Sequence, residues 1–312
     1  MIDRLKKSLQ NKMSSNNKDS SIQLKSIQIA LQELKILEGK KLSAQNIDCK
    51  EIILNDLNKA EFKVFSQWGD DGIIQFLVEH LAIENKIFVE FGVENYEESN
   101  TRFLLLNNCW NGLVIDGLAS NVAQIKSSTI YWQYQLEAKC SFITKENINE
   151  LISSYTQVKE IGLLVIDVDG NDYWIWESIE NINPVIVVVE YNSLFGNKRA
   201  ITIPYEANFK RTSAHFSNLY YGASLGALQL LGAKKDYVLV ACNNNGNNAF
   251  FVRKDKLKQL KELEVDKAYK KATFRESRNE ANKLTYLNLE DAAKLIQGLL
   301  VVNVKTGQTE PF

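Results

Sequence analysis

Short runs of β-branched and aliphatic residues alternate with amphipathic segments through the middle of the chain. Such runs predict strands of a parallel sheet that is buried on both faces. The predicted strands are Ile87–Phe91, Gly112–Asp116, Ile130–Gln135, Leu163–Asp167 and Val185–Glu190. Segments with helical periodicity accompany them, at Ile73–Leu81, Thr101–Asn107, Asn121–Lys126, Ile148–Tyr155 and Trp174–Ile179. Right-handed crossovers between such units give a doubly wound, Rossmann-like α/β domain.

Two further apolar runs predict an antiparallel hairpin at the edge of this sheet. They follow a predicted helix at Ser224–Leu231. Tyr237–Ala241 and Ala249–Val252 lie on either side of an Asn- and Gly-rich turn at Asn243–Asn248, which is typical of a hairpin.

The pattern divides the chain into three parts. We expect a helical N-terminal extension over residues 1–60, a Rossmann-like domain over 61–254, and a helical C-terminal extension over 255–312, where the sequence is charged. No motif in the last part indicates a function.

The N-terminal extension predicts two helices with a polar break at Ser14–Ser21. The second helix carries apolar residues at alternating three- and four-residue steps and ends at Gly39; these residues are Leu24, Ile27, Leu31 and Leu34. We favour a helix docked on its own domain, because the heptads are too few to define a coiled coil. The alternatives are a dimerising helix, which would make the protein a homo-oligomer, and a membrane-surface anchor.

Composition and charge narrow the classes of function. The chain has 312 residues with 37 Lys and Arg against 38 Asp and Glu, a net charge of −1. No basic field favours nucleic acid as a partner. No apolar run is long enough to span a bilayer or to form a signal peptide. We therefore expect a cytoplasmic protein that binds neither nucleic acid nor a membrane through a spanning segment.

Four predicted strands end in an acidic residue: Glu90, Asp116, Asp167 and Glu190. Ligands of doubly wound sheets bind at the carboxyl ends of the strands. Carboxylates gathered at one edge repel one another and lose hydration, so a purely structural sheet has no reason to collect them. The order of these acids predicts a ligand site.

The loop after the first predicted strand selects the kind of ligand. Residues 92–98 contain one glycine, Gly92, and three glutamates. A dinucleotide brings an anionic pyrophosphate and would require G-x-G-x-x-G with free backbone amides. S-adenosylmethionine carries a sulfonium and an amino group and no phosphate, so an acidic loop suits it. Asp116 lies where an acid reads the ribose in nucleotide-binding folds.

Four segments together resemble the FkbM-type S-adenosylmethionine-dependent methyltransferases: Phe88–Glu94, Gly112–Gly117, Leu164–Gly170 and Val187–Tyr191. The resemblance extends to the lead-in Ser66–Gly72 and the closing Asn248–Val252, and covers roughly residues 62–254. It implies that Glu90 and Gly92 hold the methionine end, Asp116 the ribose, and the segment around Asp167 the transferring methyl. The expected cofactor-binding residues are Gln67, Glu90, Gly92, Asn100, Asp116 and Gly117. The chain departs from the family in the first loop, where Val93, Glu94 and Asn95 follow a single glycine.

Methyl transfer to a hydroxyl requires in-line alignment and removal of a proton. Asp167 and His215 are the expected catalytic residues. His215 lies in a segment rich in aromatic and basic residues, which suits a sugar that carries a phosphate or nucleotide. An ordinary loop histidine is the alternative for His215, and His80 is expected to be structural because it lies in an amphipathic helix.

A divalent ion offers a second route to the same chemistry. Asp167, Glu190 and Asn192 supply hard oxygen ligands of the kind that suit Mg²⁺ or Mn²⁺. This pattern is similar to metal-dependent sugar O-methyltransferases. Such an ion would bind the acceptor oxygen and lower its pKa. The alternative is that Asp169 and Asp172 cap the following helix and bind no ion.

These patterns favour an S-adenosylmethionine-dependent O-methyltransferase. The expected acceptor is a hydroxyl of a sugar-like compound in surface-polysaccharide or related glycan biosynthesis. Two alternatives stay open: a non-catalytic scaffold in a polysaccharide assembly, which the missing loop glycines favour, and a nucleotide-sugar-modifying enzyme of another type, such as a dehydrogenase.

Overall fold

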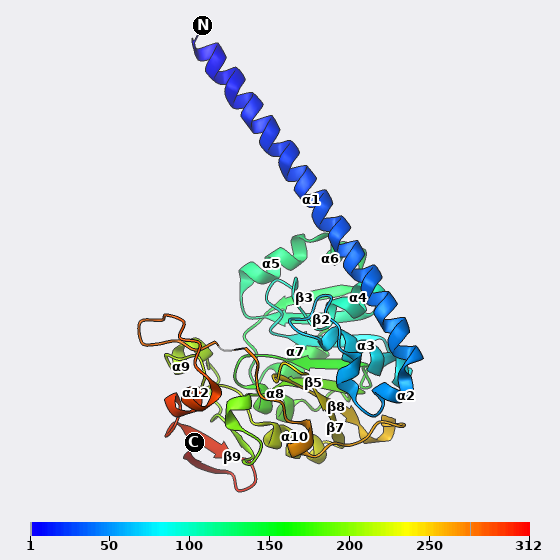
Figure 1. Cartoon of the computed structure of the whole chain (residues 1–312), viewed down its shortest axis with the longest axis vertical. Helices are drawn as coiled ribbons and strands as arrows, with labels where there is room; N and C mark the ends of the chain where they lie inside the picture. The colour runs from blue at the N-terminus through cyan, green and yellow to red at the C-terminus, as the bar shows by residue number, and fades with distance from the viewer. Residues whose placement is uncertain (1, 275) are drawn as a thin grey trace.

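The computed structural model describes residues 2–274 and 276–312, with side chains described from Gln23 onward apart from Lys25 and Arg275. A layered α/β body carries one long helix, α1 (Ile2–Asp48), which projects far beyond it (Figure 1). Among the described residues, no helix combines the length and the apolar character needed to cross a membrane.

A seven-stranded sheet forms the centre of the body. Its strands run in the order β3-β2-β1-β4-β5-β8-β7, with bounds β1 Ile87–Phe91, β2 Asn111–Asp116, β3 Leu136–Cys140, β4 Leu163–Ile166, β5 Ile186–Glu190, β7 Tyr237–Cys242 and β8 Asn248–Arg253. Strands β1 to β5 pair in parallel, and β8 pairs antiparallel with both β5 and β7. The predicted fold class and the edge hairpin are confirmed.

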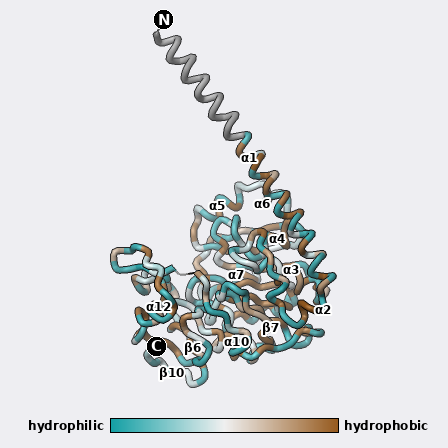
Figure 2. Tube along the Cα trace, viewed as in Figure 1, coloured by the Kyte–Doolittle hydropathy of each residue, from teal (hydrophilic) through white to brown (hydrophobic). Residues whose placement is uncertain are grey.

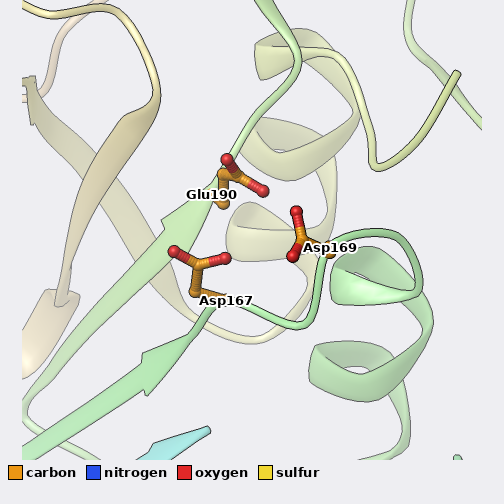
Figure 3. A group of neighbouring side chains, drawn as sticks. All are labelled: Asp167, Asp169 and Glu190. Carbon is orange, nitrogen blue, oxygen red and sulfur yellow. The ribbon is translucent and has the colours of Figure 1, made fainter. Parts of the chain in front are cut away.

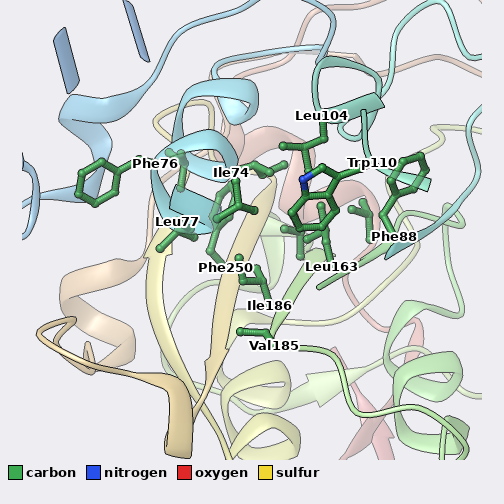
Figure 4. Close-up of a cluster of buried hydrophobic side chains, with 14 of the residues drawn as sticks. Ile74, Phe76, Leu77, Phe88, Leu104, Trp110, Leu163, Val185, Ile186 and Phe250 are labelled. Carbon is green, nitrogen blue, oxygen red and sulfur yellow. The ribbon is translucent and has the colours of Figure 1, made fainter. Parts of the chain in front are cut away.

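Alternate residues of each central strand enter different cores. Phe88, Val165 and Val188 pack in a cluster on one face (Figure 4), whereas Val89, Leu164 and Val187 pack in a cluster on the other. The first face is covered by helices α3 (Asp70–Leu81), α4 (Arg102–Asn108), α5 (Ala119–Ser127) and α6 (Thr129–Gln133). The second is covered by α7 (Ile148–Ser153), α8 (Asp172–Ser178) and α10 (Leu225–Lys234). Burial on both faces explains the continuous apolar runs in the sequence.

The C-terminal extension is mostly not helical, contrary to the prediction. Among its described residues are two short α-helices, α11 (Val265–Ala268) and α12 (Leu289–Leu295), and strands β9 (Leu300–Asn303) and β10 (Gln308–Pro311). These strands form a separate antiparallel sheet with β6 (Ile201–Thr202). Most charged residues of the C-terminal extension lie on loops and short turns and not along helices. A high content of charged residues was therefore not evidence for helix here.

The third strand lies later in the chain than predicted. Residues Thr129–Gln133 form α6, and the strand is Leu136–Cys140. The aromatic and β-branched residues around Ile130 favoured a strand, but Ile130 is buried in the core while Trp132 is exposed. The actual strand, with Glu and Lys at alternate positions, is half buried at the edge of the sheet.

The N-terminal extension begins with a single helix rather than two. Helix α1 continues through Ser14–Ser21 and past Gly39 to Asp48. A Cβ on Gly39 would lie 2.7 Å from Val64 Cγ2 and 2.8 Å from Phe103 Cε2, so this glycine allows close packing of α1 on the domain rather than ending the helix. The C-terminal part of α1, around Gly39, is docked on the domain as predicted. The part that carries Leu24, Ile27, Leu31 and Leu34 is not, since these side chains are exposed.

The remaining short elements connect these parts. They are α2 (Lys50–Ile53), α9 (Arg211–Ala214) and the 3₁₀ turns Leu57–Ala60, Ser193–Phe195 and Lys254–Lys256.

Candidate active site

A cleft of about 640 Å³ opens at the carboxyl ends of the parallel strands. The acids that end four of the predicted strands all line it, as do the other residues expected to bind the cofactor. These lining residues are Gln67, Glu90, Gly92, Asn100, Asp116, Gly117, Asp167 and Glu190. Other residues, which were not among the expected site residues, also line the cleft, including Leu118, Phe142, Phe209, Arg211 and Glu276. The strand order therefore does bring the predicted acids to one site.

The carboxylate of Glu90, at the end of β1, accepts hydrogen bonds from the loop that follows the strand. Its Oε1 accepts a hydrogen bond from the Asn100 amide at 2.8 Å, and its Oε2 accepts from the Ser99 hydroxyl at 2.9 Å and from Thr101. Burial raises the pKa of Glu90, and these bonds oppose that shift. Glu90 therefore fixes the path of residues 92–101. Asn100 Oδ1 is buried in the same wall of the cleft without a partner.

The β1 loop adopts a left-handed backbone at three alternate positions. Gly92 has φ +72°, and a Cβ there would lie 1.7 Å from the Asp167 carbonyl oxygen. Glu94 and Tyr96 have φ 47° and 65°, a conformation that costs a non-glycine residue ~1–2 kcal/mol. Tyr96 is fully buried, and its hydroxyl lies 2.9 Å from Thr101 Oγ1. The surrounding contacts thus hold a turn that glycines would adopt without strain.

Asp116, at the end of β2, joins two loops of the cleft. Its Oδ2 accepts from the Glu94 amide at 2.9 Å. Its Oδ1 accepts from the Leu118 amide at 2.8 Å and from Asn121 Nδ2 at 3.0 Å. Beside it, the exposed side chains of Leu118 and Phe142 form an apolar part of the cleft wall.

Three carboxylates form a cluster where β4 and β5 end (Figure 3). One oxygen each of Asp167, Asp169 and Glu190 lies within 4.8 Å of the others. Glu190 is buried and its Oε2 has no hydrogen-bond partner. Burial, followed by repulsion between the carboxylates, raises the pKa of Asp167 and of Glu190 well above the ordinary range. Such a pair can hold a proton or a cation.

Arg211 places a positive charge beside this cluster. Its Nη1 lies 2.8 Å from Asp169 Oδ1, its Nη2 lies 3.5 Å from Glu276 Oε2, and its guanidinium stacks 4.0 Å from the Tyr221 ring centroid. Glu276 comes from the C-terminal extension, so that segment forms part of the cleft wall. Only the basic and aromatic character of residues 205–221 signalled Arg211 in the sequence; nothing there signalled Glu276.

His215 and Asn192 do not belong to the cleft lining. His215 Nδ1 lies 2.7 Å from Ser217 Oγ, and its ring packs against Phe216, which fits the alternative of an ordinary loop histidine. Asn192 Nδ2 donates to the carbonyls of Leu219 and Tyr221, so its amide is used in holding that loop. The expectation of His215 as a base and of Asn192 as a metal ligand is not supported by this geometry.

Asp172 is a structural acid of the turn before α8 and does not cap that helix, contrary to the helix-cap alternative, whereas Asp169 joins the cluster. Asp172 Oδ1 accepts from the Val168 amide at 2.9 Å and Oδ2 from the Gly170 amide at 2.9 Å. Burial raises the pKa of Asp172 to about 6. Asp169 is exposed and adopts a left-handed φ of 55°. The third carboxylate beside Asp167 and Glu190 is therefore Asp169, and Asn192 is not part of this cluster.

Comparison with known proteins gives only remote similarities. No protein-family model and no curated protein matches the sequence. The N-terminal domain of EvdMO1 with SAH bound aligns at 7% identity and TM-score 0.39, over 60% of this chain and 80% of that one. An O-methyltransferase from Bacillus cereus in complex with SAH aligns at 10% identity and TM-score 0.38, over 70% and 88%. An S-adenosylmethionine-dependent methyltransferase from Clostridium acetobutylicum aligns at 9% identity and TM-score 0.37, over 66% and 98%. Similarities this low assign no activity to this chain.

Proposed function

We propose that the protein is an S-adenosylmethionine-dependent O-methyltransferase that acts on a hydroxyl of a sugar-like acceptor. The observation that carries this proposal is the cleft itself: carboxylates from four parallel strands meet in it, and its first loop has no glycine-rich cradle for a phosphate. A cationic donor without phosphate matches this charge, because its sulfonium and amino groups are attracted to the acids. A dinucleotide would meet repulsion there.

Each wall of the cleft has a part of the donor that it could bind. Asp116 ends β2 and can accept a ribose hydroxyl, since a carboxylate has about four acceptor sites and the protein uses three of them. Leu118 and Phe142 offer an apolar surface for the adenine. Asn100, with its free buried Oδ1, and the loop shaped by Glu90 lie on the methionine side.

Asp167 and Glu190 are the groups that can accept the acceptor proton. Asp167 lines the cleft beside Gly92, and Glu190 keeps one oxygen free of hydrogen bonds. Their raised pKa values bring their titration closer to neutral pH, where a general base is most effective. The basic and aromatic residues Lys210, Arg211 and Phe209, which also line the cleft, suit an acceptor with a sugar ring and an anionic group.

The acid cluster also has the chemistry of a Mg²⁺ or Mn²⁺ site. Asp167, Asp169 and Glu190 would hold the ion through hard oxygen atoms, and when bound it would lower the pKa of the acceptor hydroxyl. Arg211 already pairs with Asp169 and offsets part of the negative charge, so the same cluster can act without an ion. We keep the metal as an optional part of the proposal.

The motif resemblance supports a place in the FkbM-type family and in cytoplasmic biosynthesis of surface polysaccharides or related glycans. A non-catalytic scaffold is the second candidate, and the strained loop at Glu94 and Tyr96 is the observation in its favour. The unused oxygen of Glu190 speaks against it, because a scaffold gains nothing from a buried unpartnered carboxylate.

A transfer assay tests the proposal. Donor labelled on its methyl group is incubated with the protein and a panel of nucleotide-activated and phosphorylated sugars, with Mg²⁺ or with a chelator. The expected result is label on an acceptor hydroxyl, and its loss in Glu190→Gln. Binding of donor without transfer to any acceptor favours the scaffold, and failure to bind donor contradicts both the donor assignment and the activity.

A further inference from the structure

The projecting part of α1 carries an apolar stripe that nothing in the described chain covers. Leu24, Ile27, Leu31 and Leu34 have exposed fractions of 61%, 56%, 55% and 60%. They recur at steps of three, four and three residues, which places them on one face of the helix. Figure 2 shows this apolar stretch on the helix outside the body. We call these four residues the α1 seam.

A different face of α1 is anchored to the body. Gly39 packs against Val64 and Phe103, Ser43 Oγ donates to Glu79 Oε1 at 3.1 Å, and Asn46 Nδ2 donates to the Ala60 carbonyl at 2.8 Å. At 3.6 residues per turn these anchoring residues lie about a third of a turn from the seam. The helix therefore cannot rotate to bury the seam without losing the anchor.

We propose that the α1 seam pairs with the same seam of a second copy of this chain in a short, parallel two-helix contact. The three-four-three spacing is the a/d pattern that lets one helix pack its knobs into the holes of another. With Leu24 and Leu31 at a, the flanking e and g positions are Gln23, Gln28, Ala30 and Lys35. Each g–e pair across a parallel dimer then contains at most one charge, so nothing repels self-pairing.

The charge of this segment does not suit a lipid surface. Interfacial helices that bind anionic membranes are rich in Lys and Arg on the polar face, whereas residues 23–37 contain two lysines and one glutamate.

The stability of the projecting helix also favours a packing partner. The helix contains the run Ser14–Ser21, which is poor in helix formers, and most helical stability in proteins comes from packing of an apolar face.

The parallel arrangement is compatible with the docking of α1 on its own body. The anchored face and the seam differ, so each body can stay docked near the C-terminal end of α1 while the two seams pair (Figure 1). This inference does not depend on the proposed activity.

Sedimentation equilibrium of the full chain tests the pairing. The expected result is a concentration-dependent dimer for the parent protein and a monomer for Leu31→Glu, with self-association weakened by about a hundredfold or more, as two buried carboxylates would cause. Ile29→Glu is the matched control: Ile29 is equally exposed, at 59%, but lies outside the seam. This variant should stay dimeric. Circular dichroism and thermal melting confirm that both variants are folded.

Oxidation of Leu31→Cys tests the direction of the helices. A parallel pair in register brings the two a positions close enough for a disulfide, and the parent protein, with Cys49, Cys109 and Cys140 exposed, is the control for other cross-links. A cross-linked dimer specific to the variant is expected.

The inference is overturned by a monomeric parent at tens of micromolar, by a dimer that survives Leu31→Glu, or by dissociation that Ile29→Glu causes equally. Binding of α1 to anionic vesicles with a monomeric protein would assign the seam to a membrane instead.

Discussion

At the scale of single residues, the carboxylates of the cleft divide by how much of their hydrogen-bonding capacity the protein already uses. Glu90 and Asp116 each accept at least three bonds from their neighbours. Glu190 leaves Oε2 without a partner, and Asp167 sits beside it. Glu90 therefore shapes the site, Asp116 braces two loops and keeps about one acceptor site for a ligand, and Asp167 and Glu190 are available for chemistry.

Glu190→Gln should lower kcat by about 10²- to 10⁴-fold at neutral pH, the usual contribution of a general base. In the parent enzyme the rate should rise with pH as the Asp167–Glu190 pair, whose pKa values are raised, loses its proton. Removing the charge of Glu190 relieves repulsion on Asp167, so the residual rate should rise at lower pH. A pH–rate profile of both proteins measures this, and an unchanged profile would contradict the assignment.

The buried carboxyl of Asp70 should make the free energy of unfolding depend on pH, independently of catalysis. Its Oδ2 is buried without a partner, and burial raises its pKa to about 7. Between its unfolded and folded pKa values the native state binds the extra proton, so stability falls as the pH rises through this range, by up to about 4 kcal/mol. Asp70→Asn should remove that fall, as urea denaturation at pH 5 and pH 8 would show.

The neighbouring Asp71 is the control. Its Oδ2 accepts from three backbone amides and the Ser66 hydroxyl, so Asp71→Asn should destabilise the protein at both pH values. Equal responses of the two variants to pH would refute the role given to Asp70.

Glu94→Gly should increase stability by ~1 kcal/mol, because glycine adopts the left-handed φ of this position without strain. Its amide, which donates to Asp116, is kept. Glu97→Gly is the matched control: Glu97 is exposed in the same loop and does not have a positive φ, so glycine there should decrease stability. Thermal unfolding compares them, and a loss in both variants would mean that Glu94 is not strained.

At the scale of elements, the site depends on close contact between the loops after β1 and β4. The contact lies at Gly92, whose Cα faces the Asp167 carbonyl so closely that no side chain fits. On its other side, the Gly92 amide donates to the Ile115 carbonyl of β2 at 2.9 Å. The contact between Gly92 and Asp167 sets the distance between the β1 loop, which is proposed to bind the methyl donor, and the carboxylate cluster at the ends of β4 and β5.

Gly92→Ala should therefore destabilise the protein by more than 1–3 kcal/mol, the usual range for overpacking, and abolish donor binding. Gly307→Ala separates steric overlap from backbone strain. Gly307 has nearly the same φ, +73°, but nothing lies within 4 Å of an added Cβ. That variant should lose only the ~1–2 kcal/mol of backbone strain. Denaturant melts of the two proteins give the comparison, and similar losses would show that the loop contact is unimportant.

Sequence predicted the elements whose pattern reflects burial, and missed those set by tertiary contacts. Runs such as Leu163–Asp167 are apolar because both faces of the sheet are covered, so their strands were predictable. Helix α6 was missed because its aromatic residues favour strands locally. The acids at strand ends were predictable from strand order. Arg211, at the start of the short helix α9, and Glu276, far along the chain from it, meet in the cleft through tertiary contacts, and no local pattern encodes that.

At the scale of the whole molecule, the strand order brings the acidic strand ends together and the loops close a cleft around them. Seven strands of one sheet support the site, while the C-terminal segment contributes Glu276 to its wall. A negatively lined cleft of low dielectric concentrates its field on a bound cation. The central claim is that this charge selects a phosphate-free, cationic methyl donor.

Isothermal titration calorimetry with S-adenosylmethionine and with NAD⁺ tests that claim most directly. The parent protein should bind S-adenosylmethionine and not NAD⁺, and Asp116→Ala, while still folded, should bind the donor at least about tenfold more weakly, the loss of one or two hydrogen bonds to a charged group. Equal affinity of the parent for both compounds, or undiminished donor binding by Asp116→Ala, would contradict the account.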